Sequence, residues 1–344
     1  MRLNEHGGSD AGPAVAHDFS SNASPLGPPP QLLAAVLGAE RERYPDPAYT
    51  ALRAQLGAAT GVGPARVLPC SGGAEAIRRL SLAALLAGSR CVWVPQPGFG
   101  DYAAATLALN MNVRSYRSIT ELCQGLSDAD LVWVCEPCNP SGSTLSNEDW
   151  QALSLALQAT KASLAIDQAY EPLRLHGHSQ LPADLAAQAW RLHCPNKALG
   201  LTGVRAAYLL APAQADRLLA HAQAVAPSWV LSSEGCALLM HWHSEDTRRH
   251  LSEVRGVLRG WQAAQQQMLA ELDWQQTPSC SNFWLARPSQ ALCLQRLRNN
   301  HNNGGIKLRD AQSFGLPDWV RLSVQPPESQ AALRAALQEE LKTQ

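Results

Sequence analysis

Residues 131–142 read LVWVCEPCNPSG and residues 163–170 read SLAIDQAY, and both stretches begin with an apolar run and end in polar or turn-forming residues. Further apolar runs lie at residues 91–94 and 205–210. Helical patterns at residues 74–86 and 147–160 lie between the runs. Strands that are apolar along their whole length are covered on both faces, and their alternation with helices is typical of parallel sheets. The sequence therefore predicts an α/β fold built on a mostly parallel sheet.

Length and composition restrict the class of protein. The 344 residues correspond to roughly two domains at about 150 residues each. With 46% hydrophobic and 17% charged residues, the chain is typical of globular proteins and not of disordered ones. The net charge of -1 excludes nucleic-acid or anionic-membrane binding that is driven by bulk positive charge.

The sequence also predicts a cytoplasmic protein. No apolar run approaches the roughly 18 residues of a membrane helix, and the start MRLNEHGGSDAG lacks the apolar core of a secretory signal. Nine scattered cysteines fit free thiols in a reducing compartment better than a disulfide framework. We expect no metal site, because His241 and His243 lie in a helical stretch at positions that point to different sides.

The pattern changes after about residue 226, which indicates a second domain. A helical stretch rich in Gln and Ala is followed by shorter strand and helix patterns, at residues 232–272, 282–286, 290–299, 320–324 and 329–342. Near the start of the chain, the stretch SPLGPPP favours an extended arm, because proline restricts φ and lacks a donor, and a short helical pattern follows at residues 31–43. We expect an arm at 1–40 that joins a small α+β domain at 231–344, with a large domain at 41–230.

In parallel α/β sheets, ligands bind outside the carboxyl ends of the strands, so the residues that follow the strands matter most. The stretch PCSGGAEAI runs from a strand through a small-residue turn into a helix, where Gly72, Gly73 and Ala74 offer N–H groups to an anion. No P-loop signature follows, and an ordinary turn is the alternative. Asn139 follows another strand and precedes a proline, which restricts its backbone to extended geometry; a routine turn is the alternative.

Three charged residues follow the later strands. Asp167 ends an apolar strand, where a carboxylate is costly unless it is paired with a cation or a helix N-terminus. Lys197 lies among small and apolar residues, and Arg205 opens the next strand. A desolvated lysine has a lowered pKa and can form a Schiff base, whereas a lysine that reaches solvent is the alternative. In this order the groups suit a ligand with a phosphate, an anionic phenolic oxygen, a basic ring nitrogen and an aldehyde, as in pyridoxal 5'-phosphate.

This constellation resembles the fold-type I pyridoxal-phosphate enzymes, the aspartate aminotransferase superfamily, over almost the whole chain. Within that superfamily it is most similar to the branch of histidinol-phosphate aminotransferases and threonine-phosphate decarboxylases. The resemblance implies a large cofactor-binding domain, with a mostly parallel seven-stranded sheet flanked by helices, and a smaller α+β domain. It also implies pyridoxal 5'-phosphate as the cofactor.

The resemblance implies roles for residues around the cofactor ring. Lys197 is the lysine that binds the cofactor covalently, and Asp167 pairs with the ring nitrogen so that the ring can accept electrons. Asn139 and Tyr170 contact the phenolic oxygen, and Phe99 stacks on the ring.

The cofactor's phosphate has its own implied set of residues. In this chain they are Gly72, Gly73, Ala74, Cys194 and Arg205. Cys194 stands where the family usually has a serine, and a thiol is the weaker hydrogen-bonding group. Tyr44 would reach the phosphate of a neighbouring subunit, which implies a homodimer.

The substrate side is implied to lie in the second domain and the arm. Arg321 matches the arginine that binds a substrate carboxylate, and Arg309 matches a second cation near the distal group. The stretches HGG and DFSSNASPLGPP resemble the start of the decarboxylases, in which His6 and Asn22 would hold a substrate phosphate. The expected substrate is thus a phosphorylated amino acid or amino alcohol.

The reaction implied by these motifs is the decarboxylation of L-threonine O-3-phosphate to (R)-1-amino-2-propanol O-phosphate in cobalamin biosynthesis. The same residues would serve transamination if the Cα–H bond, and not the bond to the carboxylate, stood perpendicular to the ring. An aminotransferase of the histidinol-phosphate type is therefore the main alternative. A non-catalytic regulatory protein that binds pyridoxal phosphate is a further one.

Overall fold

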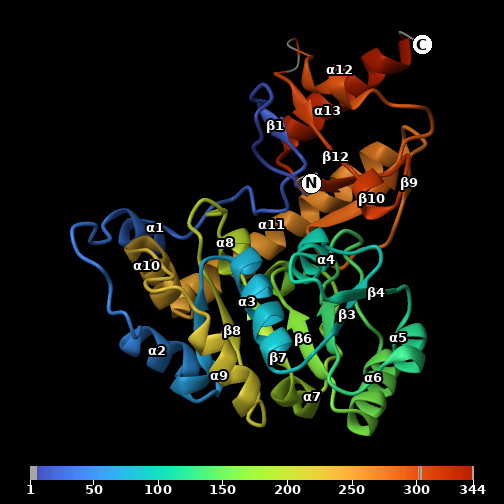
Figure 1. Cartoon of the computed structure of the whole chain (residues 1–344). Helices are drawn as coiled ribbons and strands as arrows, with labels where there is room; N and C mark the ends of the chain where they lie inside the picture. Colours follow the sequence, from blue (N-terminus) through green and yellow to red (C-terminus); the bar gives the residue numbers. More distant parts are fainter. Residues whose placement is uncertain (1–5, 301, 303, 343–344) are drawn as a thin grey trace.

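The computed structural model describes residues 6–300, 302 and 304–342. Seven strands form its central sheet (Figure 1). In spatial order they are β2 (Val67–Cys70), β8 (Ala207–Leu210), β7 (Trp190–His193), β6 (Ser163–Asp167), β5 (Leu131–Cys135), β3 (Cys91–Pro95) and β4 (Asn112–Tyr116). Strand β8 runs antiparallel to its neighbours β2 and β7, and the other neighbouring pairs are parallel. The predicted mostly parallel, seven-stranded α/β sheet is confirmed.

Helices cover both faces of this sheet because its strands are apolar on both sides. On β5, Trp133 packs into one core while its neighbours Val132 and Val134 pack into another, as the alternation of side chains along a strand requires. The first core includes side chains from α3 (Gly73–Leu86), α4 (Gly100–Leu107) and α9 (Asp216–Ala224). The second core includes side chains from α5 (Ile119–Gly125), α6 (Asn147–Ala159) and α7 (Ala183–Gln188).

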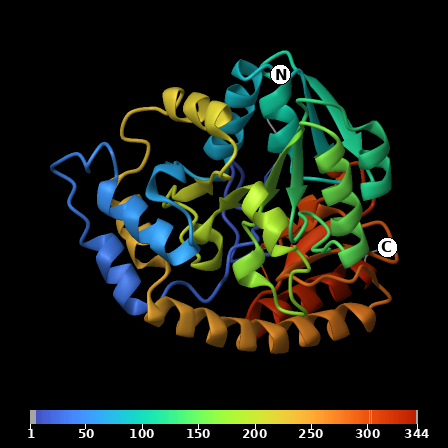
Figure 2. The same cartoon turned by 90° about the horizontal axis from the view of Figure 1, so that it is seen from below.

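A second, smaller sheet forms from the carboxyl-terminal part of the chain. Its antiparallel strands are, in order, β12 (Arg309–Asp310), β13 (Val320–Ser323), β10 (Phe283–Arg287) and β9 (Gln275–Gln276). The helices of this part are α11 (Glu245–Ala270), α12 (Leu294–Arg298) and α13 (Pro327–Lys342). Figure 2 shows α11, in orange, running along one side of the molecule to the elements of the second sheet.

The N-terminal arm pairs with a strand from the carboxyl-terminal part of the chain. Strand β1 (His17–Asp18) pairs in parallel with β11 (Ile306–Lys307). After the arm, α1 (Pro30–Leu37) packs against α10 (Ser233–Trp242), which also contacts α2 (Thr50–Thr60). The boundaries of the three predicted parts stay predictions.

Several element boundaries differ from the sequence patterns for local reasons. The stretch 232–272 contains two helices, because Ser244 begins α11 by accepting a hydrogen bond from the Thr247 N–H at 3.2 Å. The helical pattern at 31–43 ends at Leu37, where Gly38 follows. Among the described helices, none combines the length and hydrophobicity that crossing a bilayer requires.

Candidate active site

The strand ends bring the predicted residues to one edge of the large sheet. A cavity of about 340 Å³ lies there. Its lining includes residues from four of the predicted strand ends, namely Gly73, Ala74, Asn139, Asp167, Tyr170, Cys194, Lys197 and Arg205, together with Phe99. Residues separated by more than a hundred positions in sequence thus share one cavity, as expected for the carboxyl edge of a parallel sheet.

Asp167 is the last residue of β6 and is nearly enclosed. Its Oδ2 accepts a hydrogen bond from the Tyr102 O–H at 2.7 Å, and its Oδ1 accepts one from the Ala169 N–H at 2.9 Å. Burial raises the pKa of Asp167 above its ordinary value, although these hydrogen bonds and the positive charge of Lys197 oppose the rise. A cation bound in the cavity would offset the cost of burying this carboxylate.

Lys197 lies on the short helix α8 (Pro195–Ala198). Its Nζ is 5.3 Å from the centroid of the Tyr170 ring. Burial lowers the pKa of Lys197 and electrostatic interactions raise it; among these, the interaction with the Asp167 carboxylate operates near neutral pH, and the net shift is upward from the ordinary lysine value. The amine must therefore lose a proton before it acts as a nucleophile.

The small-residue turn before α3 forms a cradle with two side chains from the β7–β8 connection. Gly72 has a φ of +81°, and a Cβ placed on it would lie 2.4 Å from Nη2 of Arg205. A Cβ on Gly73 would lie 2.9 Å from the Sγ of Cys194. Burial raises the pKa of Cys194 to about 12, so this group stays a neutral thiol. The free N–H groups of the first helical turn and the Arg205 guanidinium suit an anion.

A second cavity of about 420 Å³ shares Phe99, Asn139, Tyr170, Lys197 and Arg205 with the first. Its lining also holds the four predicted substrate residues, which are His6, Asn22, Arg309 and Arg321. The two cavities therefore adjoin around Lys197, and the second one carries most of the cationic side chains.

Arg321 and Arg309 are both buried in this second cavity. Arg321 donates from Nη1 to Oδ1 of Asn139 and from Nη2 to the carbonyl oxygen of Ser20, each at 2.6 Å. Burial lowers its pKa to about 10, and the side chain is still a cation at neutral pH. Arg309 donates to Oγ of Ser313 at 2.6 Å, and its guanidinium carbon lies 5.0 Å from the Phe314 ring centroid.

The arm reaches over this cavity as a close-fitting segment. A Cβ on Gly7 would lie 1.8 Å from the carbonyl oxygen of Ser20, so only glycine fits there. His6 lies with its Nε2 3.6 Å from Oδ1 of Asp101. Asp10 anchors the arm, because it accepts from Arg298 at 2.6 and 2.9 Å and from Lys307 at 2.6 Å.

Tyr44 lies away from both cavities. Its side chain is 77% exposed, and its ring stacks on Trp229 with the ring centroids 4.3 Å apart. The described chain thus does not bring Tyr44 to its own site. Its expected contact with a neighbouring subunit's site stays a prediction.

Sequence reasoning assigned no role to Tyr102. The sequence does contain a pattern that places Tyr102 near the site. Tyr102 follows Phe99 by three positions, and residues so spaced at a helix start lie on one face. Tyr102 donates its hydrogen bond to Asp167, 65 positions further along the chain, and that contact depends on the fold.

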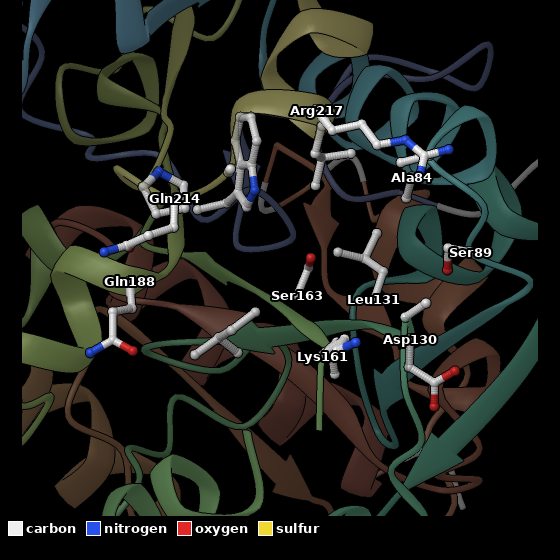
Figure 3. A pocket seen from close by; sticks show the side chains of 17 residues that line it. Ala84, Ser89, Asp130, Leu131, Lys161, Ser163, Gln188, Gln214 and Arg217 are labelled. Atoms are coloured by element: carbon white, nitrogen blue, oxygen red, sulfur yellow. The ribbon is translucent and has the colours of Figure 1, made fainter. Parts of the chain in front are cut away.

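A further cavity of about 550 Å³ lies at the opposite edge of the sheet. Its lining includes Leu131 and Ser163, the first residues of β5 and β6, with Asp130, Lys161 and Arg217 nearby (Figure 3). None of the predicted site residues lines it. In the described part of the chain, no group of three or more His, Cys, Asp or Glu side chains could hold a metal ion.

The residues at the carboxyl edge fit pyridoxal phosphate. The cradle at Gly72 and Gly73 suits its phosphate, and the buried Asp167 carboxylate suits a cationic ring nitrogen. Two buried polar atoms in the adjoining cavity, Oδ1 of Asn22 and Oδ1 of Asn196, accept no hydrogen bond from any described residue. Buried polar atoms without a partner are uncommon, and these two belong to residues that line the cavity.

The sequence and the fold of this chain are similar to those of known proteins. The sequence model of the family described as aminotransferase class I and II matches residues 16–339. Histidinol-phosphate aminotransferase 1 of Thiobacillus denitrificans is 28% identical over 329 residues, which cover 89% of this chain and 80% of that relative.

Two solved structures share the fold. L-threonine-O-3-phosphate decarboxylase from Porphyromonas gingivalis gives a TM-score of 0.77 at 22% identity, over 94% of this chain and 99% of that one. Histidinol-phosphate aminotransferase from Sinorhizobium meliloti, in complex with pyridoxal-5'-phosphate, gives a TM-score of 0.79 at 21% identity, over 96% and 91% of the two chains.

Proposed function

The chain belongs to the aminotransferase class I and II family of pyridoxal-phosphate-dependent enzymes, and from that membership we propose that it holds pyridoxal 5'-phosphate at Lys197 and acts on a phosphorylated amino compound. The observation that carries the proposal is the meeting of Lys197, Asp167 and the turn residues Gly73 and Ala74 at one cavity. When bound, this cofactor supplies an electron sink for a bond that breaks at the substrate's Cα.

Each residue of the first cavity has a proposed task toward the cofactor. Lys197 provides the amine that binds it and, once released, a proton carrier beside Cα. Asp167 balances the charge of the ring nitrogen. Asn139 and Tyr170 hold the phenolic oxygen, and Phe99 covers the ring. The phosphate is held by Gly73, Ala74, Cys194 and Arg205 of the lining, together with Gly72, which packs against Arg205.

The second cavity is proposed to orient the substrate. Arg321 presents two N–H groups suited to a carboxylate, and Arg309 provides a second buried cation. His6 and Asn22 come to the same cavity from the arm. A substrate with two anionic groups, one of them a phosphate, would engage both parts of this lining beneath the arm.

We propose decarboxylation of L-threonine O-3-phosphate as the reaction. Its substrate carries a carboxylate and a phosphate on a short backbone, which matches Arg321 together with Arg309, His6 and Asn22 in one cavity. Because Arg321 is held by Asn139 and Ser20, it can keep the carboxylate in one orientation relative to Lys197. The sequence motifs of the arm support the same substrate.

Transamination of the histidinol-phosphate type is the second candidate. The relatedness to histidinol-phosphate aminotransferase 1 of Thiobacillus denitrificans, over most of both chains, favours it. The cofactor site is the same for both reactions, and both substrates are phosphorylated, so the second cavity serves either one. The aminotransferase has the stronger support from relatives, and the decarboxylase from the arm.

A product assay separates the two reactions. Protein reconstituted with pyridoxal phosphate is given threonine phosphate, and released carbon dioxide and aminopropanol phosphate are measured. A parallel sample receives histidinol phosphate with 2-oxoglutarate, and glutamate is measured. Glutamate formation without gas release supports the aminotransferase and contradicts the decarboxylase; protein that takes up no cofactor contradicts both.

We also propose that the enzyme is a homodimer in which Tyr44 completes the neighbouring site. The exposed pair of Tyr44 and Trp229 supports this, because a stacked aromatic pair is unusual on a free surface.

A further inference from the structure

One hydrogen bond links the Asp167 carboxylate to a residue outside the predicted set. The Tyr102 O–H donates to Oδ2 of Asp167 at 2.7 Å, and both side chains line the first cavity. The other carboxylate oxygen accepts from the Ala169 N–H at 2.9 Å. The carboxylate therefore has one side-chain donor and one backbone donor, and it has no freedom to rotate without losing one of them.

Packing holds Tyr102 itself in place. The ring is fully buried, and it stacks on Trp133 with centroids 5.0 Å apart and planes 17° apart. Its edge meets Phe99 at 5.7 Å and 85°. Tyr102 thus connects the residue proposed to cover the cofactor ring with the residue proposed to bind the ring nitrogen.

The surroundings keep Tyr102 a neutral donor. Burial raises the pKa of Tyr102 well above its ordinary value, and the charge of Asp167 raises it further. The other titratable groups near Asp167 are Lys197 from α8, Cys135 at the end of β5 and Cys194 before α8. Its interaction with Cys138 together with burial raises the pKa of Cys135, and burial raises that of Cys194, so both stay neutral near pH 7. Tyr102, Lys197 and the Ala169 N–H are the groups that favour an ionised Asp167.

We propose that Tyr102 is a positioning residue that orients the Asp167 carboxylate and favours its ionised form toward the ring nitrogen of the cofactor. This inference rests on the proposed function, since it concerns the same site. Tyr102 acts through Asp167 and has no proposed contact with reacting atoms.

The test compares two phenylalanine variants of buried tyrosines. Tyr102→Phe removes the hydroxyl that faces Asp167. Tyr116→Phe is the matched control, because the Tyr116 O–H donates at 2.8 Å to the carbonyl oxygen of Trp133 and faces the other core. Thermal unfolding of each variant measures the general cost of losing a buried hydroxyl, which we expect to be similar for the two.

Titration with pyridoxal phosphate, followed by visible absorbance, gives the readout specific to the site. We expect Tyr102→Phe to weaken cofactor binding roughly tenfold, the effect of losing one hydrogen bond to a charged group. Because that bond favours the ionised carboxylate, its loss raises the pKa of Asp167. The low-pH change in the bound cofactor's absorbance then moves to higher pH by about one unit. Tyr116→Phe should leave both measurements at wild-type values.

A double-mutant cycle shows whether Tyr102 acts through Asp167. In an Asp167→Asn background, Tyr102→Phe should change cofactor affinity by less than about twofold, because the charged acceptor is gone. An equal effect in both backgrounds, or wild-type affinity and pH response in Tyr102→Phe alone, overturns the inference while the proposed function stands. Wild-type protein that takes up no pyridoxal phosphate overturns the proposed function and this inference with it.

Discussion

Arg321 donates from Nη1 to Oδ1 of Asn139 at 2.6 Å, which joins β13 of the small sheet to the loop after β5 across 182 positions of sequence. The same guanidinium donates to the carbonyl oxygen of Ser20 in the arm. Three separate parts of the chain therefore meet at one cation. Each Nη atom carries two N–H groups, so Arg321 can donate to a substrate carboxylate while its bonds to Asn139 and Ser20 keep the guanidinium oriented.

Arg321→Lys keeps the charge and removes the two-pronged donor. We expect kcat/KM to fall roughly 10- to 100-fold, the range for a lost hydrogen bond to a charged group, mainly through a higher KM. Steady-state kinetics on threonine phosphate and on histidinol phosphate with 2-oxoglutarate measure this. Arg287→Lys, at the exposed end of β10, is the control and should behave as wild type. Unchanged kinetics in Arg321→Lys would contradict the proposed role.

Lys197→Ala should abolish covalent attachment of pyridoxal phosphate. Without the amine, activity should fall by about 10²- to 10⁴-fold or more, since general acid–base catalysis alone contributes that much. Borohydride reduction followed by mass spectrometry of peptides locates the attachment. Lys161→Ala, which removes a lysine lining the cavity at the opposite sheet edge, is the matched control. A cofactor adduct on any other lysine would refute the assignment.

Cys194→Ser places a stronger hydrogen-bonding group in the phosphate cradle, next to Gly73. We expect about 2- to 10-fold tighter binding of pyridoxal phosphate, the range for one neutral hydrogen bond. Pyridoxal, which lacks the phosphate, should bind with unchanged affinity, so titration with both compounds isolates the effect. Cys123→Ser, at a partly buried thiol on α5 in the other core, controls for the loss of a thiol elsewhere. Equal changes for both compounds would place Cys194 outside the phosphate site.

Asp10→Asn removes the carboxylate that ties the arm to Arg298 and Lys307. Because the arm carries His6 to the second cavity, KM for the phosphorylated substrate should rise severalfold with little change in melting temperature. The difference from wild type should shrink at high salt, which already screens the exposed ion pairs. Asp246→Asn, which breaks the surface pair with Arg249, is the control. A KM that does not respond to Asp10→Asn argues against a role of the arm in substrate binding.

Mixing two inactive variants tests the proposed homodimer. Lys197→Ala disables a chain's own site, whereas Tyr44→Ala disables the site of its neighbour if Tyr44 acts across the interface. Hybrid dimers then contain one intact site, and a measurable fraction of wild-type activity should return on mixing. Each variant alone, at the same total concentration, provides the baseline. Activity that stays at that baseline, with subunit exchange verified by mass, would contradict a shared site.

The sheet was predictable where burial acts on consecutive residues. Strands β5 and β6 coincide with the predicted runs because every residue of these central strands must be apolar or end the strand. The edge strand β4, Asn112–Tyr116, was not predicted, since an edge position leaves most of its side chains exposed and polar. Helix boundaries near residues 37 and 243 depended on local capping and shifted accordingly.

The site residues that lie at strand ends were predictable from the sequence. Strand ends in a parallel sheet meet at one edge, so Asn139, Asp167 and Lys197 could be grouped from their positions alone. The hydrogen bond of Tyr102 to Asp167, and the anchoring of the arm by Asp10, depend on side-chain packing between distant segments. No local pattern carries that information. The raised pKa of Lys197 has the same origin, since it reflects neighbours brought by the fold.

The antiparallel strand β8 lies between β2 and β7, although it follows both in the chain. The strand before the glycine turn and the strand before Lys197 are therefore joined only after residues 207–210 have inserted between them. A nascent chain that has just emerged beyond Lys197 contains Lys197, Asp167 and the glycine turn, but it lacks Arg205 and the strand that completes this part of the sheet. A cofactor that binds only the completed site stabilises the folded protein and does not stabilise earlier folding intermediates.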